Sequence, residues 1–253
     1  MEPVCLVIGA GAGIGGNVGK RFAQAGYHSV LCRRSDEQGL HKLVSEIEAE
    51  GGKASGYLLD AARDDTIEER VAAIEAEIGP IEVAVYNLGA QIGDRPLEAT
   101  SCKQFELGWR LGTFGLFRLA SLVCPLMAER GKGTILVTSA TAAVRGNKGQ
   151  HSHAAALGGR RMLCQSLNAQ FAAEGIHVAH ILVDGGVDAP DTLGKMLGPE
   201  RFKELRETRG ANDGLMLPEK MAETYFHIAQ QHRSVWTHEL DMRSYSDLAW
   251  WNH

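Results

Sequence analysis

The apolar positions along the chain follow two alternating patterns. Short continuous runs rich in β-branched residues predict strands, and the longer segments between them, with apolar residues every three or four positions, predict helices. The runs predict strands at 3–9, 28–32, 53–60, 81–87, 133–139, 176–184 and 234–240. The helices are expected at about 14–25, 35–50, 64–78, 102–130, 152–174 and 218–231. Strict alternation with strands that are apolar on both faces predicts an α/β fold, a parallel sheet covered by helices on both sides.

The organisation is that of a single domain spanning 1–253. The chain shows no linker-like composition, no internal repeat and no low-complexity segment, and its 253 residues suit one α/β domain. Residues 187–215 are rich in glycine and proline and are expected to be irregular. A connection of that length is typical of a substrate lid or binding loop. Ser35 begins a Ser-Asp-Glu-Gln sequence that predicts a capping box at the start of the second helix.

Composition and charge narrow the function classes. Hydrophobic residues make up 44% of the chain and charged residues 23%, which excludes disorder. The net charge of -5, with both signs interspersed, argues against a nucleic-acid partner and leaves a small-molecule substrate. The five cysteines form no Cys-x-x-Cys pair, so we expect reduced thiols in the cytoplasm and no metal site. We expect no secretory signal, because no basic leader precedes the first apolar run. We also expect no membrane span, because no apolar run is long enough to cross a membrane.

The sequence "GAGAGIGG" at 9–16 is the first candidate binding element. Gly11, Gly13 and Gly16 fit a G-x-G-x-x-G pattern that follows a predicted strand and opens a predicted helix. Glycines there let the backbone approach a pyrophosphate, and the helix N-terminus offers free N–H groups. This context favours a dinucleotide site over a purely structural glycine turn.

The end of the second strand bears on the choice of dinucleotide. An acidic residue there would accept from the ribose 2′-hydroxyl of NAD(H), but this chain has Arg33 and Arg34. Two arginines favour NADP(H), whose 2′-phosphate they could bind, although a solvated basic pair is the alternative. Asp36 is interpreted as a residue of the first helical turn.

With these elements placed, the chain resembles the short-chain dehydrogenase/reductase (SDR) family over nearly its whole length. The Thr-Gly-x-x-x-Gly-x-Gly signature of the family matches Gly9, Gly13 and Gly15, with Ile8 replacing threonine, and its catalytic serine matches Ser139. Its Asn-Asn-Ala-Gly motif appears as 86–89, and its adenine-contacting aspartate corresponds to Asp60. The resemblance implies a Rossmann-type doubly wound sheet, carbonyl/alcohol redox chemistry and a homodimer or homotetramer. The cofactor-binding residues are then expected to be Gly9, Gly11, Gly13, Ile14, Gly15, Arg33, Arg34, Asp60, Ala61, Asn87 and Gly89.

The catalytic half departs from the family. His153 and Leu157 stand where the family has its Tyr-x-x-x-Lys pair, and Gly112 falls where its catalytic asparagine is expected. The Pro-Gly turn after the sixth strand appears as Asp184-Gly185. Of the four catalytic positions only Ser139 remains.

The replacement of tyrosine by histidine leaves two interpretations. Histidine titrates near pH 6.5 without the lysine cation that tyrosine needs, so Ser139 could orient a substrate oxygen while His153 acts as general acid/base. Leu157, however, cannot hold the nicotinamide ribose as lysine does. The alternative is that His153 only fills space and that the protein is an inactive NADP(H)-binding sensor or partner subunit. A non-redox enzyme on the same fold is a further alternative.

Substrate contacts are expected from the loops that follow the strands. The candidates are Gln91, Ile92, Thr141, Ala142 and the 187–215 segment. The small residues at 140, 142 and 143 suggest a roomy apolar pocket. Trp250 and Trp251 are expected to cover an interface, or else to pack on the chain's own last helix.

Overall fold

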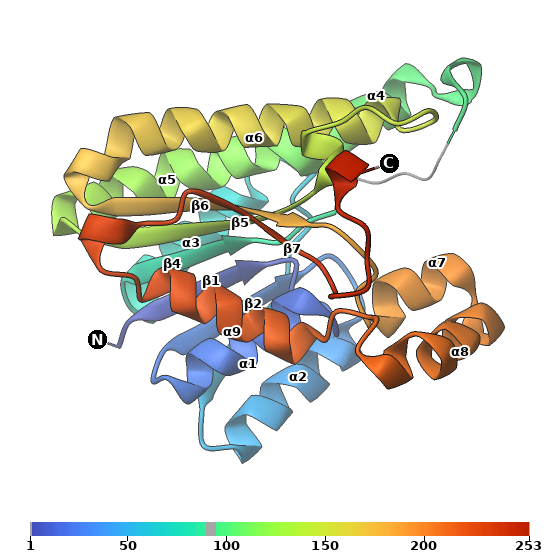
Figure 1. The fold of residues 1–253 in the computed structure, drawn as a ribbon. Coiled ribbons are helices and arrows are strands. Elements are labelled where there is room, and N and C mark those ends of the chain that lie inside the picture. The colour runs from blue at the N-terminus through green and yellow to red at the C-terminus, as the bar shows by residue number, and fades with distance from the viewer. Residues whose placement is uncertain (1, 90–94, 253) are drawn as a thin grey trace.

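Seven parallel strands form one twisted sheet at the centre of the molecule (Figure 1). The computed structural model describes residues 2–89 and 95–252. The strands lie in the order β3-β2-β1-β4-β5-β6-β7. They are β1 (Val4–Ile8), β2 (His28–Arg33), β3 (Lys53–Leu58), β4 (Ile81–Tyr86), β5 (Gly133–Ala140), β6 (Ile176–Val183) and β7 (Glu239–Met242). The α/β fold with a parallel sheet is confirmed.

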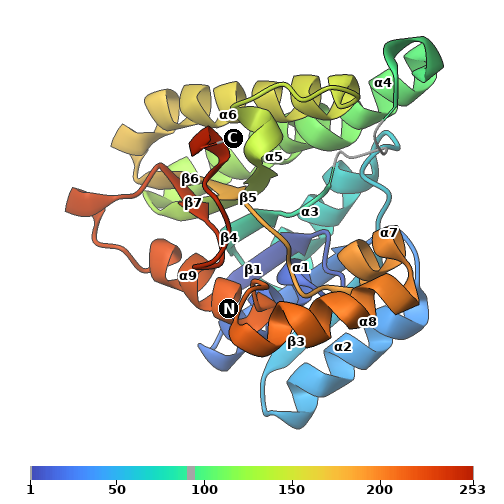
Figure 2. The same cartoon turned by 45° about the vertical axis from the view of Figure 1, so that its right-hand side comes forward.

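Helices cover both faces of this sheet. The helices are α1 (Ile14–Gln24), α2 (Glu37–Ala49), α3 (Thr66–Glu77), α4 (Cys102–Trp109), α5 (Gly115–Arg130), α6 (His151–Phe171), α7 (Lys195–Leu197), α8 (Pro199–Thr208) and α9 (Pro218–Ala229). One face carries α3, α5 and α6, and the other carries α1, α2 and α9 (Figures 1 and 2). Successive residues of β1 explain why its run is apolar throughout. Val4, Leu6 and Ile8 pack in the first layer, and Cys5 and Val7 pack in the second.

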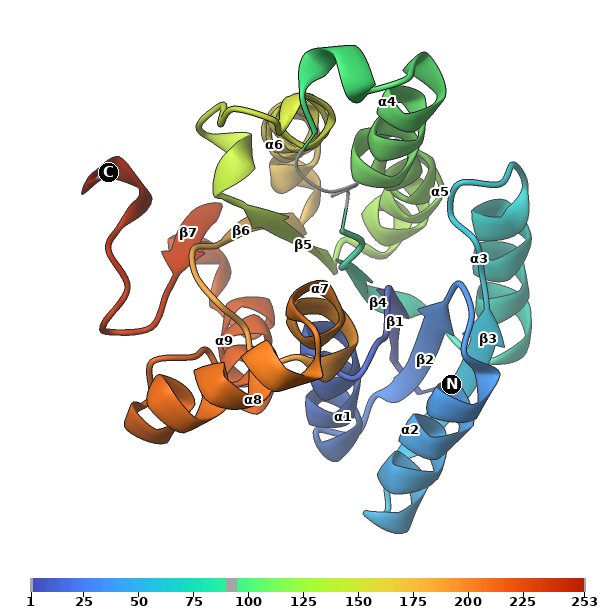
Figure 3. The ribbon, with the colours of Figure 1, turned by 90° about the vertical axis from the view of Figure 1, so that its right-hand side faces the viewer.

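The carboxyl ends of the strands define where a ligand can bind. β1 pairs with β2 on one side and with β4 on the other, so the strand order reverses direction at β1. In open parallel sheets the crevice at such a switch point is the usual ligand site. Figure 3 looks onto this edge, where the turn leading into α1 lies near α7.

The structure differs from the sequence predictions in several segments. The last strand, expected at 234–240, is β7 at Glu239–Met242, because Arg233–Val235 form a short helical turn instead. The 187–215 segment is largely helical rather than irregular, and α8 begins with Pro199 directly after Gly198. Proline at the first helical position is favourable because its missing N–H would have no partner there. The predicted capping box at Ser35 is wrong, since the side chain of Asp36 accepts from the Gly39 N–H and caps α2.

The segment expected to form one helix over 102–130 contains a wide turn. A five-residue π turn at Arg110–Phe114 joins α4 to α5. The stretch Cys102–Arg130 is long and apolar enough, by length and composition, to cross a membrane, contrary to the sequence expectation. Half of the most apolar 18-residue stretch within it is nevertheless buried. Leu116, Leu119 and Val123 pack in the core against the sheet. Its apolar character is therefore that of a core helix.

Candidate active site

The glycine-rich turn between β1 and α1 is held by the end of β4. Gly9 has a φ of 100°, which favours glycine, and its carbonyl accepts from the Asn87 side-chain amide at 2.9 Å. The Asn87 N–H donates to the Ile8 carbonyl at 2.8 Å. At Gly15 an added Cβ would lie 2.2 Å from the Gly9 carbonyl oxygen, so only glycine fits there. Asn87 is thus a structural partner of the turn, and Gly89 follows it at the exposed end of the strand.

The outer part of the turn is open toward the crevice. A Cβ at Gly11 would meet no atom within 4 Å, whereas one at Gly13 would lie 2.9 Å from the Cβ of Ala189. Gly13 precedes Ile14, the first residue of α1, and provides no side-chain cap. The N-terminus of α1 therefore presents backbone N–H groups to the space between the turn and the 187–215 segment, as a phosphate site requires.

The two arginines after β2 differ in their environments. Arg34 is exposed, whereas the Arg33 side chain is only 13% exposed and pairs with Asp36 at 3.0 Å and Asp191 at 3.3 Å. Asp36, expected within the first helical turn, instead caps α2. A cavity of about 250 Å³ lies beside these groups. Its lining residues are Ala12, Gly16, Asn17, Lys20, Arg33, Asp36, Gly39, Lys42, Leu43, Glu46 and Asp191.

The loop after β3 is anchored from α5. Asp60 accepts from the Ala62 N–H at 3.1 Å, and Ala61 is buried. The Arg118 guanidinium donates to the carbonyl of Ala61 at 3.1 Å and pairs with Glu68, which holds the pKa of that carboxyl below its usual range. Arg118 thereby fixes the loop on which an adenine contact was expected.

Ser139 lies near the carboxyl end of β5 with a free hydroxyl. Its side chain is buried, and within residues 2–89 and 95–252 its Oγ has no hydrogen-bond partner. The preceding Thr138 is fixed instead, since its hydroxyl bonds with the Tyr225 hydroxyl of α9 at 2.7 Å. A buried hydroxyl without a partner is costly unless a ligand satisfies it.

His153 lies in the first turn of α6 and is half-buried. Ala140, which follows Ser139, and Ala154, which follows His153, pack against the same small cluster, whose buried members are Ala142, Ala156 and Leu157. The cluster therefore brings the end of β5 and the start of α6 together. Leu157 is fully inside this packing, so its side chain offers no polar group to a cofactor. The alanines expected to leave room for a substrate fill the contact with α6 instead.

Arg160, which the sequence analysis did not single out, lies beneath this cluster. It is 1% exposed and donates to four backbone carbonyls, which belong to Leu88 (2.8 Å), Leu111 (3.3 Å), Gly112 (2.6 Å) and Thr138 (2.5 Å). Burial lowers its pKa from the ordinary arginine value. The signal for it was present in the sequence, because 156, 157, 160, 164 and 167 form the buried stripe of α6 and arginine interrupts it.

The three segments that Arg160 joins carry the remaining candidate positions. Leu88 lies between Asn87 and Gly89, Gly112 lies in the π turn, and Thr138 precedes Ser139. Gly112 has no side chain to replace the expected asparagine, but its carbonyl is held by the guanidinium. π turns of this kind occur frequently at functional sites.

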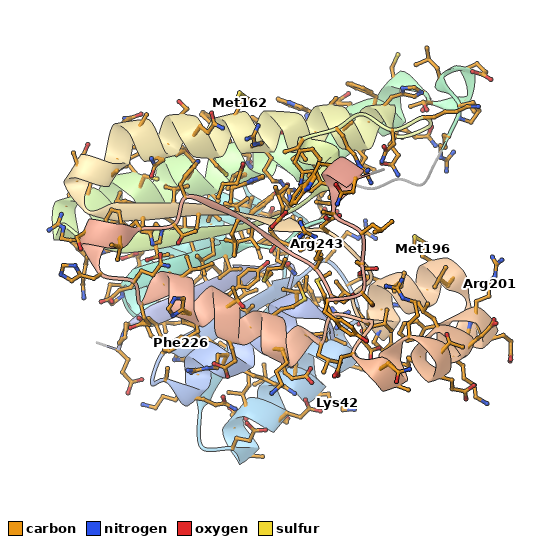
Figure 4. All side chains as sticks on the ribbon, viewed as in Figure 1. Lys42, Met162, Met196, Arg201, Phe226 and Arg243 are labelled. Carbon is orange, nitrogen blue, oxygen red and sulfur yellow. The ribbon has the colours of Figure 1, made fainter. Side chains whose placement is uncertain are left out.

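The C-terminal tail closes the β6 side of the crevice. Asp184, after β6, is buried and accepts from Arg243 at 3.0 Å and from the Trp250 N–H at 2.9 Å. The Trp250 carbonyl accepts from Arg145 at 3.1 Å, while the Trp251 ring is 57% exposed and packs under the Arg243 guanidinium. Arg243 is labelled beside the sheet in Figure 4, between α9 and the tail. The tail thus packs on the strand ends.

An apolar cavity of about 630 Å³ opens beside the start of α6. Its lining residues are Leu97, Thr100, Cys102, Phe105, Glu106, Trp109 and His151. Thr141 lies in the short turn after β5, whereas Gln91 and Ile92 lie outside the described residues. In the described part of the chain, no group of three His, Cys, Asp or Glu side chains could hold a metal ion.

The chain is similar to several known proteins. The family model described as short chain dehydrogenase matches residues 3–193. The chain is 28% identical over 234 residues to the 3-oxoacyl-acyl-carrier-protein reductase FabG of Thermotoga maritima, covering 92% of this chain and 93% of that protein. A crystal structure of a short-chain dehydrogenase from Rhodopseudomonas palustris is similar with a TM-score of 0.80 and 31% identity, over 96% of this chain and 99% of the other. The fold is also that of an actinorhodin polyketide ketoreductase variant solved with NADPH (TM-score 0.84, 24% identity, 96% of both chains). The chain therefore belongs to the short-chain dehydrogenase family.

Proposed function

We propose that the protein is an NADP(H)-dependent oxidoreductase that interconverts a carbonyl and an alcohol on a small organic substrate, using Ser139 and His153. The observation that carries this proposal is the buried, unpartnered Ser139 hydroxyl within the described residues. It lies near the carboxyl end of β5, and the alanine cluster joins that strand end to the turn that bears His153. A substrate oxygen is the partner that this hydroxyl lacks.

The residues present fit a nicotinamide dinucleotide. Gly11 leaves the turn open, the α1 N-terminus can receive phosphate oxygens, and Arg33 and Arg34 carry the charge that a 2′-phosphate needs. Asp60 and Ala61 would contact the adenosine end, and Asn87 and Gly89, which follow β4, would contact the cofactor as well. The NADPH named with the actinorhodin ketoreductase supports this cofactor class.

The chemistry would divide between two side chains. The bound cofactor would supply or accept the hydride at the substrate carbon. In the reductive direction the Ser139 hydroxyl donates a hydrogen bond to the carbonyl oxygen, and the His153 imidazolium gives that oxygen its proton. In oxidation the neutral imidazole accepts the alcohol proton, and half-buried His153 exchanges it with solvent. We further propose that 187–215 covers the substrate, as a lid.

Leu157 and Gly112 favour a second candidate, a non-catalytic NADP(H)-binding protein. Leu157 is buried in the alanine cluster and Gly112 lacks a side chain, so two of the family's catalytic positions carry no polar side chain. A sensor or an inactive partner subunit would keep the glycine-rich turn and show no turnover. Binding without any turnover across a broad panel of ketones, aldehydes and alcohols would favour this candidate.

Two matched substitutions test the catalytic proposal. We expect Ser139→Ala and His153→Phe each to lower kcat about 100-fold or more while the Kd for NADPH stays within about twofold. Ser166→Ala, on the exposed side of α6, and His41→Phe, on the exposed side of α2, are the controls and should keep most activity. Turnover that survives His153→Phe refutes its acid/base role. Turnover without any nicotinamide nucleotide would instead indicate a non-redox enzyme.

We also propose a homodimer or homotetramer that works in the cytoplasm. The support for assembly is that Trp109 and Phe117 on α4 and α5 are 42% and 52% exposed, which is costly for aromatic rings in water. The support for the compartment is that all five cysteines are free thiols. Light scattering coupled to size-exclusion chromatography measures the assembly directly, and a monomer at micromolar concentration would contradict it.

A further inference from the structure

The guanidinium of Arg33 is held between two carboxylates. Asp36, on its own segment, lies 3.0 Å from Nη2, and Asp191, 158 residues away in sequence, lies 3.3 Å from the same nitrogen. The Asp191 Oδ2 that contacts Arg33 also accepts from the backbone N–H of Ala12 at 3.3 Å. A single anionic oxygen therefore accepts from both the Arg33 side chain and the Ala12 backbone N–H of the glycine-rich turn.

These two donors are the ones that a nucleotide phosphate would use at this place. Backbone N–H groups of such a turn and an arginine after β2 are the natural partners of a phosphate oxygen. Both groups line the 250 Å³ cavity, together with Asp191. The other cations of that cavity are also paired, because Lys20 lies 2.6 Å and Lys42 3.8 Å from oxygens of Glu46. A phosphate entering the cavity therefore competes with carboxylates.

The two carboxylates on Arg33 differ in what else they do. Asp36 caps α2 by accepting from the Gly39 N–H at 3.0 Å, so it is fixed by the helix that it begins. Asp191 belongs to the turn at Pro190–Gly194 in the 187–215 segment, which approaches the glycine-rich turn through Ala189. Its second oxygen lies 3.6 Å from the Lys195 ammonium, a partner on the same segment. Figure 3 shows α7, which begins at Lys195, close to the start of α1, and Met196 and Arg201 mark the far side of this segment in Figure 4.

We propose that Asp191 is a specificity-determining residue, whose carboxylate competes with the 2′-phosphate of NADP(H) for Arg33 and the Ala12 N–H. This role rests on the proposed nicotinamide cofactor. A cofactor with a free 2′-hydroxyl carries no charge to this place and meets no such competition. Asp191 therefore lowers the preference for NADP(H) below the level that Arg33 and Arg34 would give alone.

The test compares Asp191→Asn with Asp188→Asn in fluorescence titrations with NADPH and, separately, NADH at fixed ionic strength. The amide keeps an oxygen that can accept from the Ala12 N–H but loses the charge on Arg33. We expect the Kd for NADPH to fall about tenfold and the Kd for NADH to change less than about twofold. Asp188 lies on the same segment but pairs with Arg206 at 2.6 Å, so Asp188→Asn should leave the ratio of the two constants unchanged.

The outcomes separate this role from the proposed cofactor. An unchanged ratio for Asp191→Asn, weaker NADPH binding, or an equal gain for both nucleotides overturns the role of Asp191 while NADP(H) binding stands. Absence of binding of either nucleotide to the wild-type protein and to both variants, with an unchanged melting temperature, overturns the cofactor and this role with it. Turnover is not needed for the readout, so an inactive protein that binds NADPH tests the proposal equally well.

Discussion

Replacing the buried Arg160 by methionine should remove a central support of the site. Methionine approximates the length of the arginine stem and avoids a large cavity, but it donates no hydrogen bond. The carbonyls of Leu88, Gly112 and Thr138 would each lose a charged donor, whereas the Leu111 carbonyl would still accept from the Tyr86 hydroxyl at 2.6 Å. The loss therefore concerns three carbonyls at the carboxyl edge of the sheet.

The size of the effect follows from these contacts. A hydrogen bond from a charged group contributes about 1.5–3 kcal/mol, and a buried carbonyl left without a donor costs about 1–3 kcal/mol. Removing the guanidinium also relieves the cost of burying a charge with no carboxylate partner among the described contacts. The two contributions oppose each other, and the net decrease in the free energy of unfolding should be about 3–5 kcal/mol. For a chain of this length that corresponds to a melting temperature lower by about 10 °C.

The neighbouring arginine is the matched control. Arg161 pairs with Glu239 at 2.7 Å and is 32% exposed, so Arg161→Met should cost about 1 kcal/mol. Arg160→Lys should fall between the two, because it keeps the charge but cannot reach carbonyls on three segments. Urea unfolding followed by tryptophan fluorescence gives the three values. An Arg160→Met variant within 1 kcal/mol of wild type, or less affected than Arg161→Met, would refute the reasoning.

Two further predictions concern the glycine-rich turn and the stability of the protein in acid. Gly11→Ala should keep the free energy of unfolding within about 0.5 kcal/mol of wild type and yet bind NADPH at least about tenfold more weakly. Gly15→Ala should lose both stability and binding, because its Cβ would lie 2.2 Å from a carbonyl oxygen. NADPH titration and thermal melting measure the two effects. Burial lowers the pKa of His180 to about 4, whereas a histidine in the unfolded chain has a pKa near 6.5. As the pH falls, the unfolded chain therefore binds the proton first. The free energy of unfolding should consequently decrease by about 3 kcal/mol between pH 6.5 and pH 4. His180→Gln should flatten this part of the pH profile in urea unfolding, and parallel profiles would contradict the assignment.

The sequence pattern predicted the strands and helices that surround the glycine-rich turn. Continuous apolar runs predicted buried parallel strands, and β1 confirms the reason, since its alternate residues pack in opposite layers. The order of strands and helices then placed the glycine-rich turn, Asn87 and Ser139 at one edge of the sheet. Arg33 was recognised from its place after a strand, but its partner Asp191 comes from a segment 158 residues later, and no local pattern encodes such a contact.

The sequence predictions were wrong where a residue has a different structural role from the one that is usual for its type. Val235 and Trp236 raised the strand propensity of 234–240, yet Val235 is 67% exposed and the Trp236 ring stacks on His177 at the sheet edge. Gly198 and Pro199 suggested a loop, but a glycine with a φ of 82° followed by proline begins α8. Arg160 was overlooked because a charged residue is expected at the surface, and only its helical spacing with Leu157 shows otherwise.

The relation between Leu157 and Arg160 bears directly on the proposed chemistry. The two positions are three apart, so they lie on the same face of α6, and both are buried. A cation is therefore present one turn beyond the position where the family carries its lysine. The hydrogen bonds of this guanidinium among the described residues all go to backbone carbonyls, and the Tyr86 ring lies 5.2 Å away, so the guanidinium supports the strand ends. If turnover is found, the acid/base step must therefore use a side chain that needs no lysine beside it, and we propose the imidazole of His153 in the first turn of α6 for that role.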